Sequence, residues 1–424
     1  MFNNVNEAIE YIHSVYWKGS VYGLRRMYAL LDKMGNPQDS LKYVHIAGTN
    51  GKGSTAAMTA SILQKAGYRT GLYTSPYIYR FHERIQVDGQ QISDADLVEI
   101  TEMVKPLASS MNPSPTEFEL VCCIAFAYFA KMQCDVVVLE VGLGGAFDAT
   151  NVIDTPEVAV ITNIGLDHTE ILGNTVEEIA RTKAGIFKEG GHAVVYRGVP
   201  SVEQVFEEVC AEKNVILHKA DFETLKLKAH SLDGQVFDCG DRKDLVLPLL
   251  GDHQLHNASV VLSIIDAMKA QGWKITEENI YDGMRDVSWP GRFDIVSRDP
   301  LFIIDGGHNP QCIDALVKNI EDYLTDRKVI ALTGVLGDKD YADMYQPVMP
   351  LVDCFVCITP PSPRKLEAEA LEAHLTGAGA KAIACATVED GVAKALELSG
   401  KDGVVLCFGS LYTIGAIKEA LDNI

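Results

Sequence analysis

The sequence has no long hydrophobic run and no basic segment near its start. Its 424 residues contain no stretch of about 18 uncharged apolar residues. The opening Met1-Phe2-Asn3-Asn4 carries neither a basic region nor a hydrophobic stretch. We therefore expect a soluble, cytoplasmic protein that has no membrane as a partner.

The cysteines do not form the regular pattern of a disulfide framework. The ten cysteines are scattered, and several, such as Cys122-Cys123 and Cys407, lie inside apolar runs. This placement is typical of buried reduced thiols. The single C-x-x-C pair, Cys354 and Cys357, lies in an expected strand, where the two side chains would point to opposite faces. The pair therefore does not predict a redox or metal site.

The sequence also lacks a surplus of positive charge. It has 37 lysines and arginines against 58 acidic residues, which gives a formal net charge of −21. Nucleic acid is therefore excluded as an expected partner, because nothing would neutralise its phosphates. An anionic small molecule would need a few well-placed cations and a divalent metal. We expect the chain to be a monomer.

Length and element order predict two α/β domains. A single core stops growing at roughly 250–300 residues, and 47 % hydrophobic content is ample for two cores. Strand and helix patterns alternate, which predicts a doubly wound, mostly parallel sheet in residues 1–294 and a smaller Rossmann-like α/β domain in residues 300–424. Proline, glycine and charge cluster in residues 289–300, which we interpret as the linker.

Two other regions carry weaker patterns. Residues 3–34 have apolar positions at helical spacing, broken near Gly19 and Gly23, which predicts two helices with a glycine-rich connection. Residues 214–250 show short alternating segments, which indicate a small antiparallel addition of unknown function.

A glycine-rich turn follows the apolar strand at Val44. The segment Gly48-Thr49-Asn50-Gly51-Lys52-Gly53-Ser54 predicts a phosphate cradle, since glycine lets successive N–H groups face one anion and Lys52 adds a full charge. It departs from the P-loop template G-x-x-x-x-G-K-[ST] at two positions: Ile46 replaces the first glycine, and Gly53 stands between Lys52 and the hydroxyl residue that should follow the lysine directly. An ordinary strand–turn–helix junction is the alternative.

A second strand end carries a carboxylate. The buried strand Val136–Leu139 ends at Glu140 and is followed by Gly142, Gly144 and Gly145. This arrangement resembles a Walker-B strand, whose acid holds Mg²⁺, and the alternative is a structural carboxylate that caps the glycine turn. Phe147 replaces the last glycine of the dinucleotide fingerprint, so the run does not favour NAD.

Polar residues follow several other predicted elements. Asp167 and His168 follow a strand, and Lys183 and Lys188 lie in or just after a helix, where a solvated lysine pair is the usual explanation. Asn257 stands at a helix start and could offer a donor and an acceptor to an adenine edge. Asp305 and His308 flank a glycine pair. The carboxylate could accept hydrogen bonds from ribose hydroxyls, and the imidazole could bind phosphate.

These turns together resemble the folylpolyglutamate synthase and dihydrofolate synthase family of the Mur ligase superfamily. The resemblance covers nearly the whole chain through an ordered set of motifs: A-G-T-N-G-K-G-S, T-S-P with H-E-R-I, L-E-V-G-L-G-G-x-x-D-A-T-N, T-N-I-G-x-D-H, K-A-G-I-F-K, H-Q-x-x-N-A, W-P-G-R-F, D-G-G-H-N-P and F-G-S-L-Y. One motif is weak evidence, whereas the ordered set is specific.

The resemblance implies a role for each site residue. Lys52 and the backbone of residues 49–54 would hold ATP phosphates, while Ser75, Glu140 and His168 would bind Mg²⁺ together with Lys183, if that lysine is carbamylated. Carbamylation turns a repelling cation into an oxygen ligand for the metal. The remaining implied nucleotide contacts come from Asn257, Arg292, Asp305 and His308. Lys52, Lys183 and His308 are the candidate catalytic residues.

The implied reaction is ATP-dependent amide formation. ATP would phosphorylate the terminal carboxylate of a folate, and the amino group of L-glutamate would then displace phosphate. Phe118 is a candidate to stack on the pterin, although an aromatic residue at a helix start is more often part of the core. Ala146 stands where many dihydrofolate synthase relatives carry arginine, which leaves open whether dihydropteroate is also a substrate.

Two rival functions remain open at this point. Another Mur-type ligase, acting on a cell-wall nucleotide precursor, would share the ATP site, but the P-loop here follows only about forty residues and no preceding UDP-binding domain is evident. A nucleotide-binding switch without ligase chemistry would leave Lys183 and D-G-G-H-N-P unexplained. The sequence also contains no N-K-x-D guanine motif.

Overall fold

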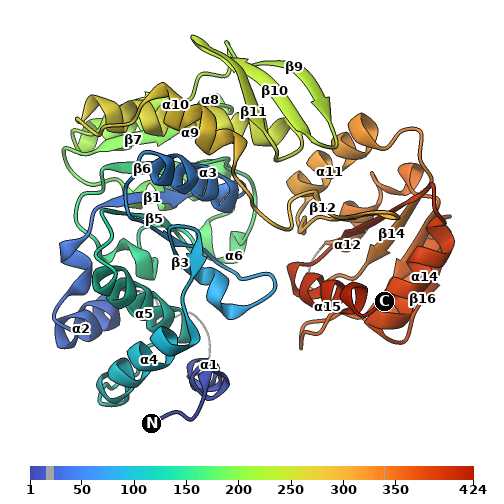
Figure 1. The fold of residues 1–424 in the computed structure, drawn as a ribbon, viewed down its shortest axis with the longest axis horizontal. Coiled ribbons are helices and arrows are strands. Elements are labelled where there is room, and N and C mark those ends of the chain that lie inside the picture. Colours follow the sequence, from blue (N-terminus) through green and yellow to red (C-terminus); the bar gives the residue numbers. More distant parts are fainter. Residues whose placement is uncertain (16–22, 339) are drawn as a thin grey trace.

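A computed structural model describes residues 1–15, 23–338 and 340–424 of the chain. Strands and helices alternate through most of it and form an eight-stranded sheet, a three-stranded sheet and a six-stranded sheet. Figure 1 shows the large sheet with its helices on one side of the molecule and the six-stranded sheet on the other. The predicted α/β fold class, with a smaller α/β unit after the first, is confirmed.

The large sheet is mostly parallel, and only β3 (Ile85–Val87) and β4 (Gln90–Gln91) run antiparallel to their neighbours. Its apolar strands are buried on both faces, as a near-continuous run such as Val136–Leu139 predicts. In spatial order the strands are β4 (Gln90–Gln91), β3 (Ile85–Val87), β2 (Thr70–Tyr73), β5 (Val136–Glu140), β1 (Tyr43–Ala47), β6 (Val158–Ile161), β7 (His192–Val195) and β8 (Ile216–Lys219).

Helices cover both faces of this sheet. Alternate residues of β5 divide between two cores. Val136 and Val138 pack with α3 (Lys52–Lys65), α9 (Asp252–Ala270) and α10 (Glu277–Arg285), whereas Val137 and Leu139 pack with α4 (Asp94–Ser109) and α5 (Glu117–Lys131). The helices of this part are α1 (Val5–Ser14), α2 (Arg25–Lys33), α3 (Lys52–Lys65), α4 (Asp94–Ser109), α5 (Glu117–Lys131), α6 (Thr169–Leu172), α7 (Val176–Lys183), α8 (Pro200–Glu212), α9 (Asp252–Ala270) and α10 (Glu277–Arg285). The predicted helices in residues 3–34 match α1 and α2, and Gly19 lies outside the described residues.

Residues 214–250 divide between two sheets. The expected antiparallel addition consists of β9 (Lys226–Ser231), β10 (Gly234–Cys239) and β11 (Arg242–Leu247). The prediction is wrong for β8, which pairs in parallel with β7 and ends the large sheet. Phe237 and Leu245 of the small sheet pack into the same core as α9, which explains its position beside that helix.

The six-stranded sheet and its helices form the second domain, and we call its hydrophobic interior the second core. Its strands, in spatial order, are β12 (Asp294–Arg298), β13 (Leu301–Ile304), β17 (Val404–Phe408), β14 (Val329–Thr333), β15 (Cys354–Cys357) and β16 (Ala382–Ala384). Only β12 is antiparallel to its neighbour. Its helices are α11 (Pro310–Tyr323), α12 (Tyr341–Tyr345), α13 (Ala368–Gly377), α14 (Val388–Ser399) and α15 (Leu411–Asp422). The segment interpreted as a linker, residues 289–300, therefore contains an edge strand of this sheet.

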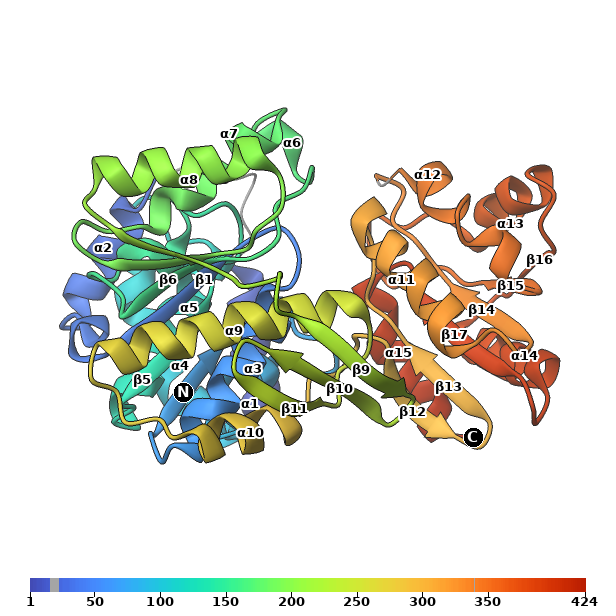
Figure 2. The same ribbon diagram turned by 90° about the horizontal axis from the view of Figure 1, so that it is seen from above.

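The β9–β10 hairpin contacts the second core at a distance from the sheet ends. The guanidinium of Arg298 on β12 donates to Asp233 Oδ1 at 2.7 Å and to the Leu232 carbonyl oxygen at 3.2 Å. The Leu232 side chain packs against the second core, and His230 lies edge-to-face with Tyr323 at 5.1 Å between ring centroids. Figure 2 shows this hairpin reaching from the first sheet region toward β12 and β13.

Two further findings bear on the composition. Within the described residues, no helix is both long and apolar enough to cross a membrane. All ten cysteines are free thiols, most of them buried. Cys354 and Cys357 belong to the cores on opposite faces of the six-stranded sheet, as their spacing in a strand predicts.

Candidate active site

A cavity of about 270 Å³ lies where the carboxyl ends of the large sheet meet the second domain. The chain leaves β1 in one direction, past β5 to β2, and leaves the neighbouring strand β6 in the other direction, to β7. The carboxyl ends of β1 and β6 therefore form a topological switch point, where α/β folds bind ligands. The cavity is lined by nearly all the residues predicted from the sequence: Thr49, Asn50, Gly51, Lys52, Gly53, Ser54, Ser75, Glu140, His168, Lys183, Asn257, Arg292, Asp305 and His308.

The turn after β1 has the backbone of a phosphate cradle. Gly48 and Gly51 both adopt positive φ, at +152° and +85°, and Gly51 is the N-cap of α3. The Lys52 ammonium donates to the carbonyl oxygens of Gly48 and Thr49, both at 3.2 Å. The positive end of a 14-residue helix and an ammonium group therefore meet at one turn.

The two departures from the P-loop template have structural explanations. A Cβ at position 53 would lie 2.7 Å from the indole of Trp289, so Gly53 leaves room for that ring. A Cβ at Gly51 would lie 2.5 Å from Asn257 Oδ1. Ile46 is a fully buried residue of β1, and the glycine that opens the turn is instead Gly48. The loop is therefore adapted to residues far along the chain.

Glu140 is a desolvated carboxylate at the end of β5. It is only 4 % exposed, and its Oε2 accepts a hydrogen bond from the Ser75 backbone N–H at 3.1 Å. Burial raises the pKa of the Glu140 carboxyl, and the positive charge of Lys52 partly opposes that shift. Such a carboxylate favours a cation nearby, and oxygen donors of this kind are the ligands that Mg²⁺ prefers.

Lys183 is a buried lysine beside the phosphate-cradle turn. It is 4 % exposed, and its Nζ donates to the Gly48 carbonyl oxygen at 2.8 Å. Burial lowers the pKa of Lys183 to about 7, and repulsion from Lys52 contributes to the shift. A large fraction of this amine is therefore unprotonated near neutral pH, as nucleophilic capture of CO₂ requires.

The second domain supplies its part of the cavity from the turn between β13 and α11. Both carboxylate oxygens of Asp305 accept backbone hydrogen bonds, from Phe293 at 2.9 Å and from Gly307 at 2.7 Å. Burial raises the pKa of Asp305, and the charge of Arg292 opposes the shift. His308 has its Nδ1 3.0 Å from the Gly306 carbonyl oxygen. These contacts fix the acid and the imidazole on the side of the cavity opposite the first domain.

The remaining predicted residues are placed less tightly. His168 has a half-exposed side chain (50 %) at the start of α6, close to Asp167. Phe118 does not line the cavity; its ring lies against Gly142, where a Cβ would come within 2.4 Å of it, and it packs on the core of the first domain. Within the part of the chain that the structure describes, no three or more His, Cys, Asp or Glu side chains are arranged to hold a metal ion. The magnesium ligand set stays a prediction.

Comparison with known proteins identifies the family. Residues 46–265 match the model of the Mur ligase middle domain, and residues 291–411 match that of the Mur ligase glutamate ligase domain. The folylpolyglutamate synthase of Lacticaseibacillus casei is 36 % identical over 99 % of both chains. The chain belongs to the folylpolyglutamate synthase/dihydrofolate synthase family of Mur ligases. The predicted resemblance is confirmed.

Other members of the folylpolyglutamate synthase/dihydrofolate synthase family agree over the whole length. The dihydrofolate synthase/folylpolyglutamate synthase of Bacillus subtilis is 34 % identical over 99 % of this chain and 100 % of its own. The structure of Mycobacterium tuberculosis folylpolyglutamate synthase complexed with ADP matches with a TM-score of 0.90, at 32 % identity, over 98 % of this chain and 97 % of that chain.

Sequence reasoning missed cavity-lining residues on one face of α11 and at the start of α9. Gln254, 1 % exposed, donates to Ser54 Oγ at 3.2 Å and so supports the phosphate-cradle turn. On α11 the cavity is lined by Gln311, Cys312, Ala315, Leu316 and Asn319. Their helical spacing after the predicted D-G-G-H-N-P turn is a signal that could have found them. Both amide atoms of Asn319 are buried and have no hydrogen-bond partner among the described residues.

Proposed function

We propose that this chain is an ATP-dependent ligase that joins L-glutamate to the terminal carboxylate of a folate through an acyl phosphate. The observation that carries the proposal is that a single cavity joins the phosphate cradle at Lys52 to the Asp305–His308 turn of the second domain. The likeness to folylpolyglutamate synthases over the whole chain supports the same reaction.

The chain's own residues supply charge and position for phosphoryl transfer. A folate carboxylate oxygen attacks the γ-phosphorus of ATP. The bond between the γ-phosphorus and the oxygen that bridges it to the β-phosphate breaks, and ADP leaves. The helix end at Gly51 and the ammonium of Lys52 stabilise negative charge on the transferring phosphoryl group. Asn257, Arg292 and Asp305 hold the nucleoside part. The glutamate amine, after losing a proton, then attacks the acyl carbon of the acyl phosphate, and inorganic phosphate leaves. His308 lies on the side of the cavity where we place this second step.

Magnesium would be held at the desolvated end of β5. Glu140, Ser75, His168 and carbamylated Lys183 are the residues that would bind it, and the raised pKa of the buried Glu140 carboxyl fits a nearby cation. The bound ion supplies charge neutralisation between two anionic reactants. The lowered pKa of Lys183 supports carbamylation, which would turn its positive charge into a negative oxygen ligand.

The folate subsite is proposed beside Phe118. Its ring lies against Gly142, a cavity-lining residue two positions after Glu140, so an aromatic ring lies directly behind the cavity wall near the proposed phosphoryl-transfer centre. Ala146 provides no cation at the position where many dihydrofolate synthase relatives carry arginine, which favours folate over dihydropteroate. We expect Phe118→Ala to raise the KM for folate about tenfold and to leave the KM for ATP unchanged. Equal changes in both constants would contradict the assignment.

The decisive experiment offers two acceptors in parallel. Purified protein with ATP, Mg²⁺ and L-glutamate is given tetrahydrofolate or dihydropteroate, and ADP and glutamylated product are measured. Product from tetrahydrofolate alone is the expected result; product from both would establish a bifunctional enzyme. ADP release without product would favour a nucleotide switch. A further reaction with a UDP-linked cell-wall precursor tests the other rival, and product in that reaction alone would favour a cell-wall ligase. Sedimentation of the same protein tests the expected monomer, and a reaction that consumes ATP and glutamate fits a cytoplasmic location.

A further inference from the structure

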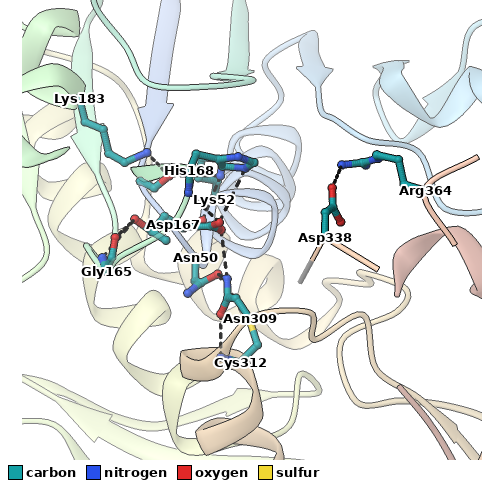
Figure 3. Close-up of polar contacts among 12 residues, drawn as sticks. Asn50, Lys52, Gly165, Asp167, His168, Lys183, Asn309, Cys312, Asp338 and Arg364 are labelled. Carbon is teal, nitrogen blue, oxygen red and sulfur yellow. Dashed lines mark hydrogen bonds and ion pairs between the residues drawn. The ribbon is translucent and has the colours of Figure 1, made fainter. Parts of the chain in front are cut away.

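Asn309 joins the two domains directly at the phosphate-cradle turn. It is the N-cap of α11, where its Oδ1 accepts the backbone N–H of Cys312 at 3.0 Å. Its Nδ2 donates in the opposite direction, to Asn50 Oδ1 at 3.0 Å and to Asp167 Oδ2 at 3.3 Å. One buried amide therefore holds the start of a second-domain helix and two turns of the first domain (Figure 3).

The Asn50 side chain is committed to the same contact. Its Nδ2 donates to Gln311 Oε1 at 2.9 Å, while its Oδ1 accepts from Asn309 and lies 3.3 Å from Cys312 Sγ. Its own backbone carbonyl oxygen accepts from Thr162 Oγ1 at 2.7 Å. Asn50 is therefore fixed from both domains, two residues before Lys52.

The surfaces around this contact fit closely. A Cβ at Gly165 would lie 2.2 Å from Gln311 Oε1, so the first turn of α11 rests on the backbone at position 165. Gln311 Nε2 also lies 3.5 Å from the Ile164 carbonyl oxygen. The interface depends on hydrogen bonds between side-chain amides and on Gly165, where a side chain would collide with Gln311. We call Asn50, Asn309 and Gln311 the amide contact.

We infer that Asn309 is a positioning residue for the ligase reaction: through the amide contact it sets the distance between the Asp305–His308 turn and the P-loop. Asp305 and His308 lie within four residues of Asn309, and Lys52 lies two residues from Asn50. A shift at the amide contact therefore moves the two halves of the site relative to each other. The residue acts through Asn50 and need not touch a substrate.

The kinetic consequence follows from the need for alignment. A displacement of about 1 Å between reacting groups can reduce a rate by about 100-fold, whereas the phosphate cradle and Asn257, which would hold part of the nucleotide, both belong to the first domain and stay together. Loss of the amide contact should therefore lower kcat much more than it raises the KM for ATP. This part of the inference rests on the proposed ligase function, but the domain geometry does not.

The test separates the amide contact from helix capping. Asn309→Ser keeps an N-cap acceptor for α11 but removes the amide that reaches Asn50. Spectroscopic labels carried by unnatural amino acids at the exposed Lys33 and Lys401 report the distance between the domains without using the native cysteines. We expect a broader and longer distance distribution, with kcat reduced about 10- to 100-fold. Thr387→Ser, which changes the N-cap of α14, is the matched control and should alter neither quantity.

A double-mutant cycle completes the test. Asn50→Ala and Asn309→Ser should together cost no more activity than the stronger single variant, because both remove the same contact. Additive losses, or an unchanged distance distribution in Asn309→Ser, would overturn the inference. If wild-type protein shows no ligase activity, the proposed function fails, while the distance measurement still decides whether Asn309 holds the domains together.

Discussion

The Lys183 ammonium nitrogen lies 2.8 Å from the Gly48 carbonyl oxygen, so a buried lysine is held against the backbone of the turn that leads to Lys52. Two lysines thus share one glycine carbonyl, because Lys52 donates to the same oxygen at 3.2 Å. Their mutual repulsion and the burial of Lys183 favour its neutral form.

Activity should depend on pH and on bicarbonate through Lys183. Its pKa of about 7 means that the amine is mostly protonated at pH 6 and mostly neutral at pH 8, so ligase activity should rise across this interval. At pH 8, added bicarbonate should increase activity in wild-type protein and not in Lys183→Arg, which we expect to be nearly inactive. The neighbouring Lys188→Arg is the control, because Lys188 does not line the cavity. Equal bicarbonate responses in wild type and Lys183→Arg would contradict the prediction.

Lys52 should be needed for turnover and not for folding. Its ammonium donates hydrogen bonds to two backbone carbonyls of its own turn, so Lys52→Ala should leave the melting temperature close to that of wild type. The loss of a charge facing the transferring phosphoryl group should lower kcat/KM by about 100-fold or more. Steady-state ADP release, with the exposed Lys33→Ala as control, measures the effect. Near-normal activity of Lys52→Ala would show that the phosphate-cradle assignment is wrong.

His45 should make the protein labile to acid. It is fully buried on β1, its Nε2 lies 2.8 Å from Thr150 Oγ1, and burial lowers its pKa from 6.5 to about 3. Between these values the unfolded chain binds a proton that the folded protein does not, so the free energy of unfolding falls as the pH falls. The loss from this group is about 1.4 kcal/mol per pH unit.

The measurement for His45 is urea unfolding at several pH values between 4 and 7. His45→Gln has no imidazole to titrate, so its stability should decline less steeply than that of wild type in this range. The difference between the two proteins isolates His45 from the buried carboxyls, whose raised pKa values change stability in the opposite direction. Parallel curves would contradict the prediction.

Asn319 should oppose stability and favour nucleotide binding. A buried amide without partners costs about 1–3 kcal/mol, so Asn319→Leu should raise the free energy of unfolding of the ligand-free protein. The same variant should reduce the stabilisation that ATP provides. Thermal unfolding with and without ATP measures both effects. Asn257→Leu is the contrast, because Asn257 donates to Gln254 Oε1 at 3.1 Å and its loss should destabilise the ligand-free protein. A less stable ligand-free Asn319→Leu would count against this interpretation.

The sequence predicted the elements better than the contacts between them. Continuous apolar runs such as β5 are distinctive for strands buried on both faces, so the α/β class and the strand-end residues were accessible. The role of Gly53 was not, because it depends on the Trp289 ring, which lies far along the chain. The same holds for Asn309: its capping role follows from local sequence, whereas its second contact depends on how the domains meet. β8 was assigned to the wrong sheet because a short amphipathic strand does not specify its partner.

The hairpin contact between Arg298 and Asp233 and the amide contact at Asn309 join the two domains at separate places. A rigid body held at two separated points retains one rotational degree of freedom, about the line that joins them. Release of the amide contact would leave the second domain attached through the hairpin, through the connecting chain and through Ile78 and Tyr79, which pack against its core. The hairpin is therefore one of the points that would restrict such a rotation.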